Sequence, residues 1–138
     1  MVTVTYRHSF SYRDFGEGRS PVLQLRISPP NRLDAAIDVD AHLDSGADSS
    51  LFDGYMITAW GMTLINDNLK HYGSTLGGSI EGYLHNVRIT VPEVGTFDLQ
   101  IGFSSARIRR NLLGRDFFAL TQIGFRERQL EYYLTPAP

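Results

Sequence analysis

The chain has 138 residues and a mass of 15.5 kDa, enough for one domain with a single core. Apolar residues make up 42% and charged residues 20%, as in soluble globular proteins, and a net charge of -2 argues against binding to nucleic acid or an acidic membrane. No cysteine is present for disulfides or a thiolate zinc site, and no apolar run suits a signal peptide or a bilayer span, so we expect a cytoplasmic protein.

Apolar and polar residues alternate along much of the chain, with the period of two that marks a half-buried strand. This pattern predicts strands at residues 2–7, 23–27, 37–43, 97–103 and 130–134. A Gly-rich loop is expected over 14–21, Pro29 and Pro30 end the second strand, and 135–138 form a loose tail. The prediction is therefore a mainly β fold in a single domain, 1–138.

Two short helices interrupt this pattern. Ser49 and Ser50 are suited to cap a helix from Leu51 to Trp60, and Gly61 offers a left-handed end for it. A second apolar segment, Phe117 to Ile123, is followed by another glycine and predicts a helix as well.

The segment Lys70 to Val91 is rich in glycine and predicts a long β-hairpin. Its tip is expected near residues 76–79, where Gly77 and Gly78 supply the positive φ that a tight turn needs.

One carboxylate stands out because the strand at 37–43 delivers it into a turn: Asp44 is followed by Ser45, Gly46, Ala47 and Asp48. Asp-Ser-Gly alone is ordinary turn chemistry. A second segment comes later, Asn111-Leu112-Leu113-Gly114-Arg115-Asp116. In this order and at this separation, the two segments resemble the signatures of retropepsin-like (retroviral-type) aspartic proteases, over about residues 23–134.

The resemblance implies a single-lobe acid protease barrel with one flap hairpin, an aspartic endopeptidase that acts as a homodimer on extended peptides without a cofactor. Two copies of Asp44 would share a proton and activate water, because like charges a few ångströms apart do not both ionise. It implies catalytic roles for Asp44, Ser45 and Gly46. The implied substrate-binding residues are Ala47, Asp48, Leu76, Gly77, Gly78, Ile80 and Leu112, and the residues that support the site are Asn111, Leu113, Gly114 and Arg115. In relatives the residues at Arg115 and Asp48 pair, and we expect this pair to be partly buried.

Other interpretations stay open. A retropepsin-like module that binds peptides or dimerises without turnover would keep the same residues, and glycoside hydrolysis also uses two carboxylates, although nothing marks a second partner for Asp44. Asp38, Asp40 and His42 share a strand face that suggests a metal, but the alternation fits a solvated face better, with His42 on the surface, and we expect no metal. Arg109 and Arg110 stand where relatives place apolar pocket walls. If they face the cleft, acidic substrate side chains become possible; otherwise they form a solvated turn.

Overall fold

The computed structural model describes residues 1, 3–16, 18–73 and 78–138, and within these ranges the chain is mainly β. The strands are β1 (Ser9–Ser11), β2 (Arg13–Asp14), β3 (Arg19–Ser20), β4 (Val22–Ser28), β5 (Ile37–Leu43), β6 (Leu51–Asp53), β7 (Leu69–Gly73), β8 (Ser79–Val91), β9 (Gly95–Ser104), β10 (Asn111–Leu113), β11 (Thr121–Arg126) and β12 (Glu131–Pro136). The helices are α1 (Tyr55–Ala59) and α2 (Arg115–Phe118), with 3-10 turns η1 (Leu33–Ala35) and η2 (Glu127–Gln129).

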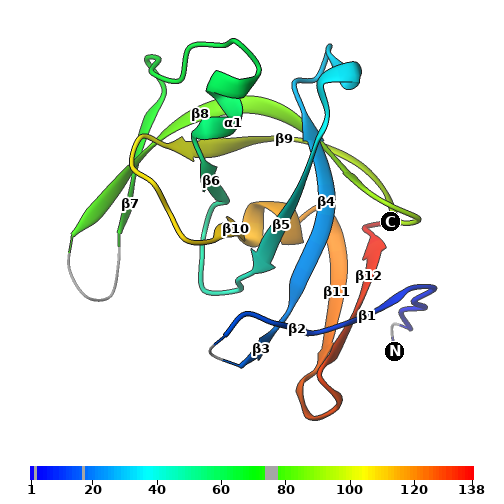
Figure 1. Cartoon of the computed structure of the whole chain (residues 1–138). Helices are drawn as coiled ribbons and strands as arrows, with labels where there is room; N and C mark the ends of the chain where they lie inside the picture. Colours follow the sequence, from blue (N-terminus) through cyan, green and yellow to red (C-terminus); the bar gives the residue numbers. More distant parts are fainter. Residues whose placement is uncertain (2, 17, 74–77) are drawn as a thin grey trace.

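Seven strands form one sheet in the order β4-β5-β10-β6-β9-β8-β7, and β4 also pairs with β8, which closes the sheet into a barrel (Figure 1). The short strand β10 lies between β5, to which it is parallel, and β6, to which it is antiparallel. A three-stranded sheet, β1-β12-β11, lies beside the barrel, and β2 and β3 form a small ladder of their own.

The core joins the barrel to this second sheet. Phe52, Ile101 and Phe103 are fully buried inside the barrel. Tyr132 on β12 is also fully buried, and its hydroxyl donates a hydrogen bond of 3.0 Å to the carbonyl oxygen of Val22 on β4. A buried tyrosine with its hydroxyl paired contributes apolar area without an unsatisfied polar group. The two sheets are therefore packed as one unit around a continuous core.

Several predicted elements are confirmed. The strands at 23–27, 37–43 and 97–103 correspond to β4, β5 and β9, and the predicted hairpin corresponds to β7 and β8, paired from Leu69 to Tyr83 through Gly73 to Ser79. Gly78 has a φ of +89°, the positive value expected near the tip. Leu76 and Gly77, also predicted at the tip, lie outside the described residues.

The predicted helix over 51–60 is wrong in its first half. Leu51 pairs with Leu112 of β10 and Gly102 of β9, so residues 51–53 form strand β6 and only Tyr55–Ala59 is helical. Hydrogen bonds to two neighbouring strands outweigh a weak helical preference that is read from side chains alone. Gly61, with a φ of +72°, does end this helix as predicted.

The predicted helix over 117–123 is also mostly wrong, as is the loose tail. Helix α2 ends at Phe118, and residues 121–126 form β11, which pairs along its length with β12. Thr135 and Pro136 belong to β12, opposite Gln122 and Thr121. The first two residues of the predicted tail therefore complete this hairpin, through a tertiary pairing that the local sequence does not show.

At the N-terminus the predicted strand over 2–7 is wrong where the structure describes it, since residues 3–7 form no strand and β1 begins at Ser9. Alternation produces a strand only where a partner strand is available, and β12 pairs with β1 only from Ser9 to Ser11. The predicted loop over 14–21 contains the short β2–β3 ladder, Arg13 to Ser20.

Among the described residues, no helix is both long and apolar enough to span a membrane.

Candidate active site

The Asp44 loop follows directly from β5 and is held by its own backbone. The Asp44 amide donates to the carbonyl oxygen of Leu113 at 3.0 Å, and the Ala47 amide donates to the carbonyl oxygen of Asp44 at 3.1 Å. The Gly46 amide donates to Asp44 Oδ1 at 2.9 Å, which fixes the rotation of the half-buried carboxylate. A Cβ at Gly46 would lie 3.2 Å from the same oxygen, so glycine keeps the space around it open. Ser45 is exposed at the outside of the turn.

The second motif packs directly behind this loop. The Arg115 amide donates to the carbonyl oxygen of Ala47 at 2.8 Å. A Cβ at Gly114 would lie 2.6 Å from that oxygen and 2.9 Å from the carbonyl carbon of Ser49, closer than real Cβ contacts. Gly114 has a φ of -99°, so it is required here by close backbone approach and not by its backbone conformation. The Asp44 loop and the segment 111–116, which are far apart in the sequence, are therefore in direct contact in the structure.

Two residues that the sequence analysis missed complete this contact. The fully buried Ser50 hydroxyl donates to Asp116 Oδ1 at 2.6 Å and accepts the Gly114 amide at 3.0 Å, while the Ser50 amide donates to Asp116 Oδ2 at 2.9 Å. The Phe117 amide also donates to Asp116 Oδ1, at 2.8 Å, at the start of α2. The sequence signal that could have predicted this contact is Ser50, just before β6, together with Asp116, just after Arg115.

Arg115 and Asp48 do form an ion pair, as predicted, but the pair is not buried. Their side chains are 64% and 79% exposed, so water screens the interaction within this chain. An exposed pair contributes a fraction of a kcal/mol at most. The expectation of a partly buried pair is therefore wrong for the single chain.

A pocket of about 590 Å³ opens between the Asp44 loop and the β7–β8 hairpin. Asp44, Gly46 and several residues predicted to bind substrate line it together: Ala47, Asp48, Ile80 and Leu112. Residues that the sequence analysis did not predict form the rest of its wall: Ser49, Leu51, Lys70, His71, Tyr72 and Gly73. Within the described ranges, Gly78 does not line this pocket, and Leu76 and Gly77 are outside those ranges.

Tyr72 connects the hairpin to the barrel beneath the pocket. Its hydroxyl donates to the carbonyl oxygen of Ser50 at 3.1 Å, and burial, with the negative charge of Asp116, raises its pKa to about 12, so it stays a donor. The ring lies against two glycines: a Cβ at Gly82 would be 2.6 Å from a ring carbon, and one at Gly102 would be 2.2 Å from the hydroxyl oxygen. Beside it, Lys70 Nζ donates to Ser49 Oγ and lies 5.5 Å from the centre of the Tyr72 ring.

The remaining support residues lie around β10. The Asn111 side chain accepts the Asp53 amide at 2.9 Å and donates to the carbonyl oxygen of Asp40 at 3.1 Å, which ties β10 to β5 and β6. Leu113 is fully buried behind the Asp44 loop.

His42 differs from expectation, and the two arginines, for which two positions were left open, lie beside it. His42 is 7% exposed and so is not a surface residue. Arg109 and Arg110 do not line the pocket that contains Asp44; they border a separate hollow with His42. No cluster of three or more metal-ligating side chains occurs among the described residues, and Asp38 and Asp40 instead pair with Arg26 and Arg13.

Two solved structures share this arrangement of strands. The structure of a retropepsin-like aspartic protease from Rickettsia conorii aligns with a TM-score of 0.59 and 13% identity, over 100% of both chains. The EIAV protease, solved in complex with an inhibitor, aligns with a TM-score of 0.56 and 17% identity, over 78% of this chain and 92% of its own. The chain has the retropepsin-like fold. No protein-family model matches the sequence, and no curated protein matches it.

The predicted mainly β, single-lobe barrel of the retropepsin-like fold is thus confirmed. At 13% and 17% identity the likeness concerns the fold alone, and the roles of individual residues stay predictions.

The contact between Tyr72 and the barrel predicts a stability effect. Gly102→Ala should lower the free energy of unfolding by about 1–3 kcal/mol, because the new methyl group displaces the Tyr72 ring from a packed site. Gly73→Ala on β7 is the matched control, since nothing lies within 4 Å of its Cβ position. Urea unfolding of both variants measures the difference. Equal stability of Gly102→Ala and the parent protein would contradict the packing of Tyr72 described above.

The Ser50–Asp116 contact predicts a second effect. Ser50→Ala should cost about 2 kcal/mol of stability, because it removes one of the two hydrogen bonds that Asp116 Oδ1 accepts and leaves the buried Gly114 amide without its partner. Ser49→Ala, one residue away, removes a hydroxyl whose partner among the described residues is the half-buried Lys70, and it should cost well under half as much. Chemical denaturation followed by Trp60 fluorescence measures both, and similar losses would show that Asp116 does not depend on Ser50.

Proposed function

We propose that the chain is an aspartic endopeptidase that hydrolyses peptide bonds of extended polypeptides, with one Asp44 from each of two copies. The observation that carries this proposal is the Asp44 carboxylate itself. It is half-buried, held through Oδ1 by the Gly46 amide, and placed in the wall of a pocket beside a β-hairpin. The retropepsin-like fold is consistent with this use of the loop.

The chemistry needs two carboxylates, and the chain supplies one such loop. When two Asp44 groups face each other, the ionised one takes a proton from water and the neutral one donates a hydrogen bond to the substrate carbonyl. The water oxygen then attacks the carbonyl carbon while the neutral Asp44 gives its proton to the carbonyl oxygen, so the pair again holds one proton. That proton passes to the amide nitrogen as the C–N bond breaks, and the other Asp44 takes a proton from one of the two hydroxyls on the former carbonyl carbon. The pair thus titrates as a single unit with one proton before and after the reaction. The Gly46 amide and the Asp44–Leu113 hydrogen bond hold each carboxylate in position before the partner arrives.

The hairpin supports a peptide as the substrate class. Strand β7 stands at the end of the seven-stranded sheet, so one of its edges is unpaired by the described strands. Lys70, Tyr72 and Gly73 of this edge strand line the pocket that contains Asp44. An extended peptide can bind to such an edge through main-chain hydrogen bonds and place alternate side chains in pockets. The exposed amides and carbonyls of β7 therefore suit a polypeptide better than a compact small molecule.

The central test is Asp44→Asn. The amide keeps the shape of the side chain but takes no proton from water, so cleavage of a fluorogenic peptide library should fall by at least about a hundredfold. Asp67→Asn, which neutralises an exposed carboxylate outside the pocket, is the control and should cleave like the parent protein. Full activity in folded Asp44→Asn would exclude the proposed chemistry. A parent protein that binds library peptides and cleaves none would indicate the silent binding module instead.

A shared site also predicts a dependence on concentration. Specific activity should fall when the protein is diluted to concentrations at which analytical ultracentrifugation shows only single chains, because half of a dyad does not turn over. Added Asp44→Asn protein should then inhibit the parent by forming mixed pairs with one carboxylate, whereas added Asp67→Asn protein should not. Specific activity that is constant through the dissociation range would show that one chain suffices.

A further inference from the structure

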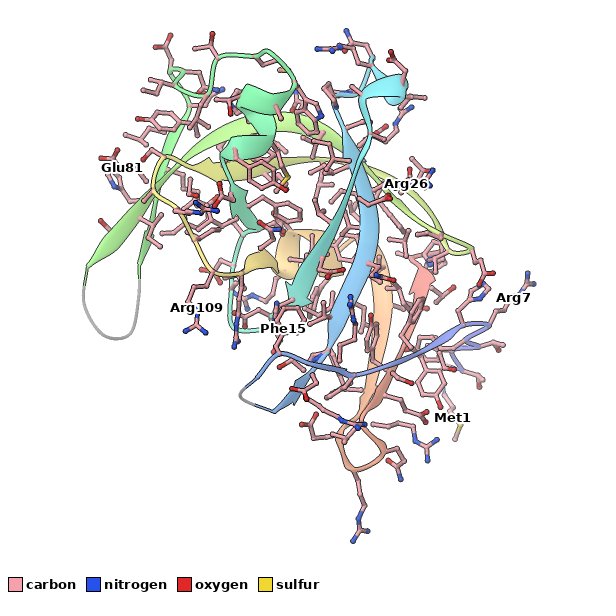
Figure 2. All side chains as sticks on the ribbon, viewed as in Figure 1. Met1, Arg7, Phe15, Arg26, Glu81 and Arg109 are labelled. Carbon is pink, nitrogen blue, oxygen red and sulfur yellow. The ribbon has the colours of Figure 1, made fainter. Side chains whose placement is uncertain are left out.

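A second hollow, of about 290 Å³, lies on the same side of β5 as Asp44. Its walls include Phe15 from the β2–β3 turn, His42 from β5, and Arg109 and Arg110 from the segment that leads into β10. Figure 2 shows the labelled Phe15 and Arg109 near the end of β5 at which the Asp44 loop begins. Nothing in the proposed chemistry uses these residues.

The strand geometry makes this hollow a neighbour of the cleft. Side chains of Asp40 and His42 lie on one face of β5, and the next position on that face is Asp44. His42 is also directly opposite Leu112 in the parallel pairing of β5 and β10, and Leu112 lines the pocket that contains Asp44. A peptide that crosses Asp44 therefore passes the mouth of the hollow within a residue or two.

His42 is the buried polar group that needs a ligand here. It is 7% exposed, and its Nε2 atom is buried with no hydrogen-bond partner among the described residues. The Phe15 ring stands edge-on to the imidazole, with 4.7 Å between ring centres, and both side chains line the hollow. Leaving a buried nitrogen unpaired destabilises the fold, and such groups in native proteins call for a specific explanation. A substrate atom that pairs with Nε2 would supply one.

The charges around the hollow favour an anion. Asp38 and Asp40 in its wall are held by Arg26 and Arg13, at 3.0 and 2.8 Å. Arg109 and Arg110 also line the hollow, and Arg110 is near enough for its positive charge to act on His42. Arginine is well suited to bind carboxylates through its planar fork of donors.

We propose that the hollow between Phe15, His42 and Arg110 is a side-chain subsite of the Asp44 cleft, and that it selects an acidic residue of the peptide substrate. This inference rests on the proposed function and names a substrate class for it. His42 donates a hydrogen bond from Nε2 to the substrate carboxylate, and Arg110 and Arg109 supply the positive surroundings. His42 and Arg110 are thus specificity-determining residues and take no part in bond cleavage.

The preference of the subsite for an acidic side chain should depend on pH, and the direction of that dependence follows from His42. Burial, followed by the charge of Arg110, lowers the pKa of His42, while Asp40 and Asp44 oppose that shift. Asp38, Arg109 and Tyr55 also border the hollow. A substrate carboxylate beside the imidazole favours its charged form, so His42 takes up a proton when an acidic side chain binds. The preference for glutamate over glutamine should therefore increase as the pH falls from 8 to 6.

The experiment compares cut positions in a library of natural peptides for four proteins: the parent, His42→Leu, Arg110→Gln and the control Arg88→Gln. Arg88 lies on β8, paired with Asp98, and its loss removes one positive charge away from the hollow. The parent and the control should show Asp and Glu enriched at one fixed distance from the cut bond. For a matched Glu and Gln peptide pair, the preference in kcat/KM should be at least about tenfold and should vanish in His42→Leu and Arg110→Gln, mostly through KM.

A second measurement does not depend on cleavage. The His42 ring resonances of nitrogen-labelled protein, assigned by their loss in His42→Leu, are followed by NMR while acetyl-glutamate amide or acetyl-glutamine amide is added. A shift with the acid only, absent in Arg110→Gln, supports the subsite even if no peptide is cut, in which case the proposed function alone fails. Cleavage without any acidic preference, or equal shifts with both compounds, would overturn the subsite and leave the endopeptidase proposal intact.

Discussion

The close contact between Gly114 and the Asp44 loop is the constraint on which the rest of the site depends. Strand β10 enters between β5 and β6, and the backbone at Gly114 comes so near to Ala47 and Ser49 that no Cβ fits. This approach lets the Arg115 amide reach the Ala47 carbonyl oxygen and brings Asp116 onto Ser50. Two segments about seventy residues apart in the chain thereby hold one loop, and the orientation of its carboxylate follows.

The sequence predicted this contact better than it predicted the secondary structure around it. A motif places particular residue types at fixed spacing, and each type meets a structural requirement. Gly114, for example, is needed because a Cβ would collide with the Ala47 carbonyl oxygen. The predicted helices over 51–60 and 117–123 were inferred from local sequence signals, but residues 51–53 and 121–123 form strands because distant partner strands offer hydrogen bonds. Strand pairing is a non-local property, so Leu51 or Thr121 in isolation gives no indication of the strand that it will join.

The candidate site also has a part that the motifs predicted and a part that depends on distant strand pairing. Asp44, Ala47, Asp48 and Leu112 meet around one pocket as the motifs imply. The opposite wall comes from β7, and its residues depend on the register of the hairpin, which glycine positions alone do not determine. His42 was misassigned for a related reason. Alternation placed it on a polar strand face, but Phe15, from a turn far along the chain, covers that face and buries the imidazole.

The Asp44 loop is already held in place in the single chain, and this matters for a site that two copies would share. In this chain the Asp44 carboxylate already has its rotation set by the Gly46 amide, and the loop is tied to β10 by backbone hydrogen bonds. If two copies associate as proposed, they do not have to order the loop, and the free energy of that interface would not be consumed in fixing the two Asp44 carboxylates. The exposed Arg115–Asp48 pair fits this view, because it adds little to the stability of one chain. If assembly covers that pair, exclusion of water would strengthen the same attraction. An interaction that is weak in the single chain would then favour the assembled form, in which two carboxylates can meet.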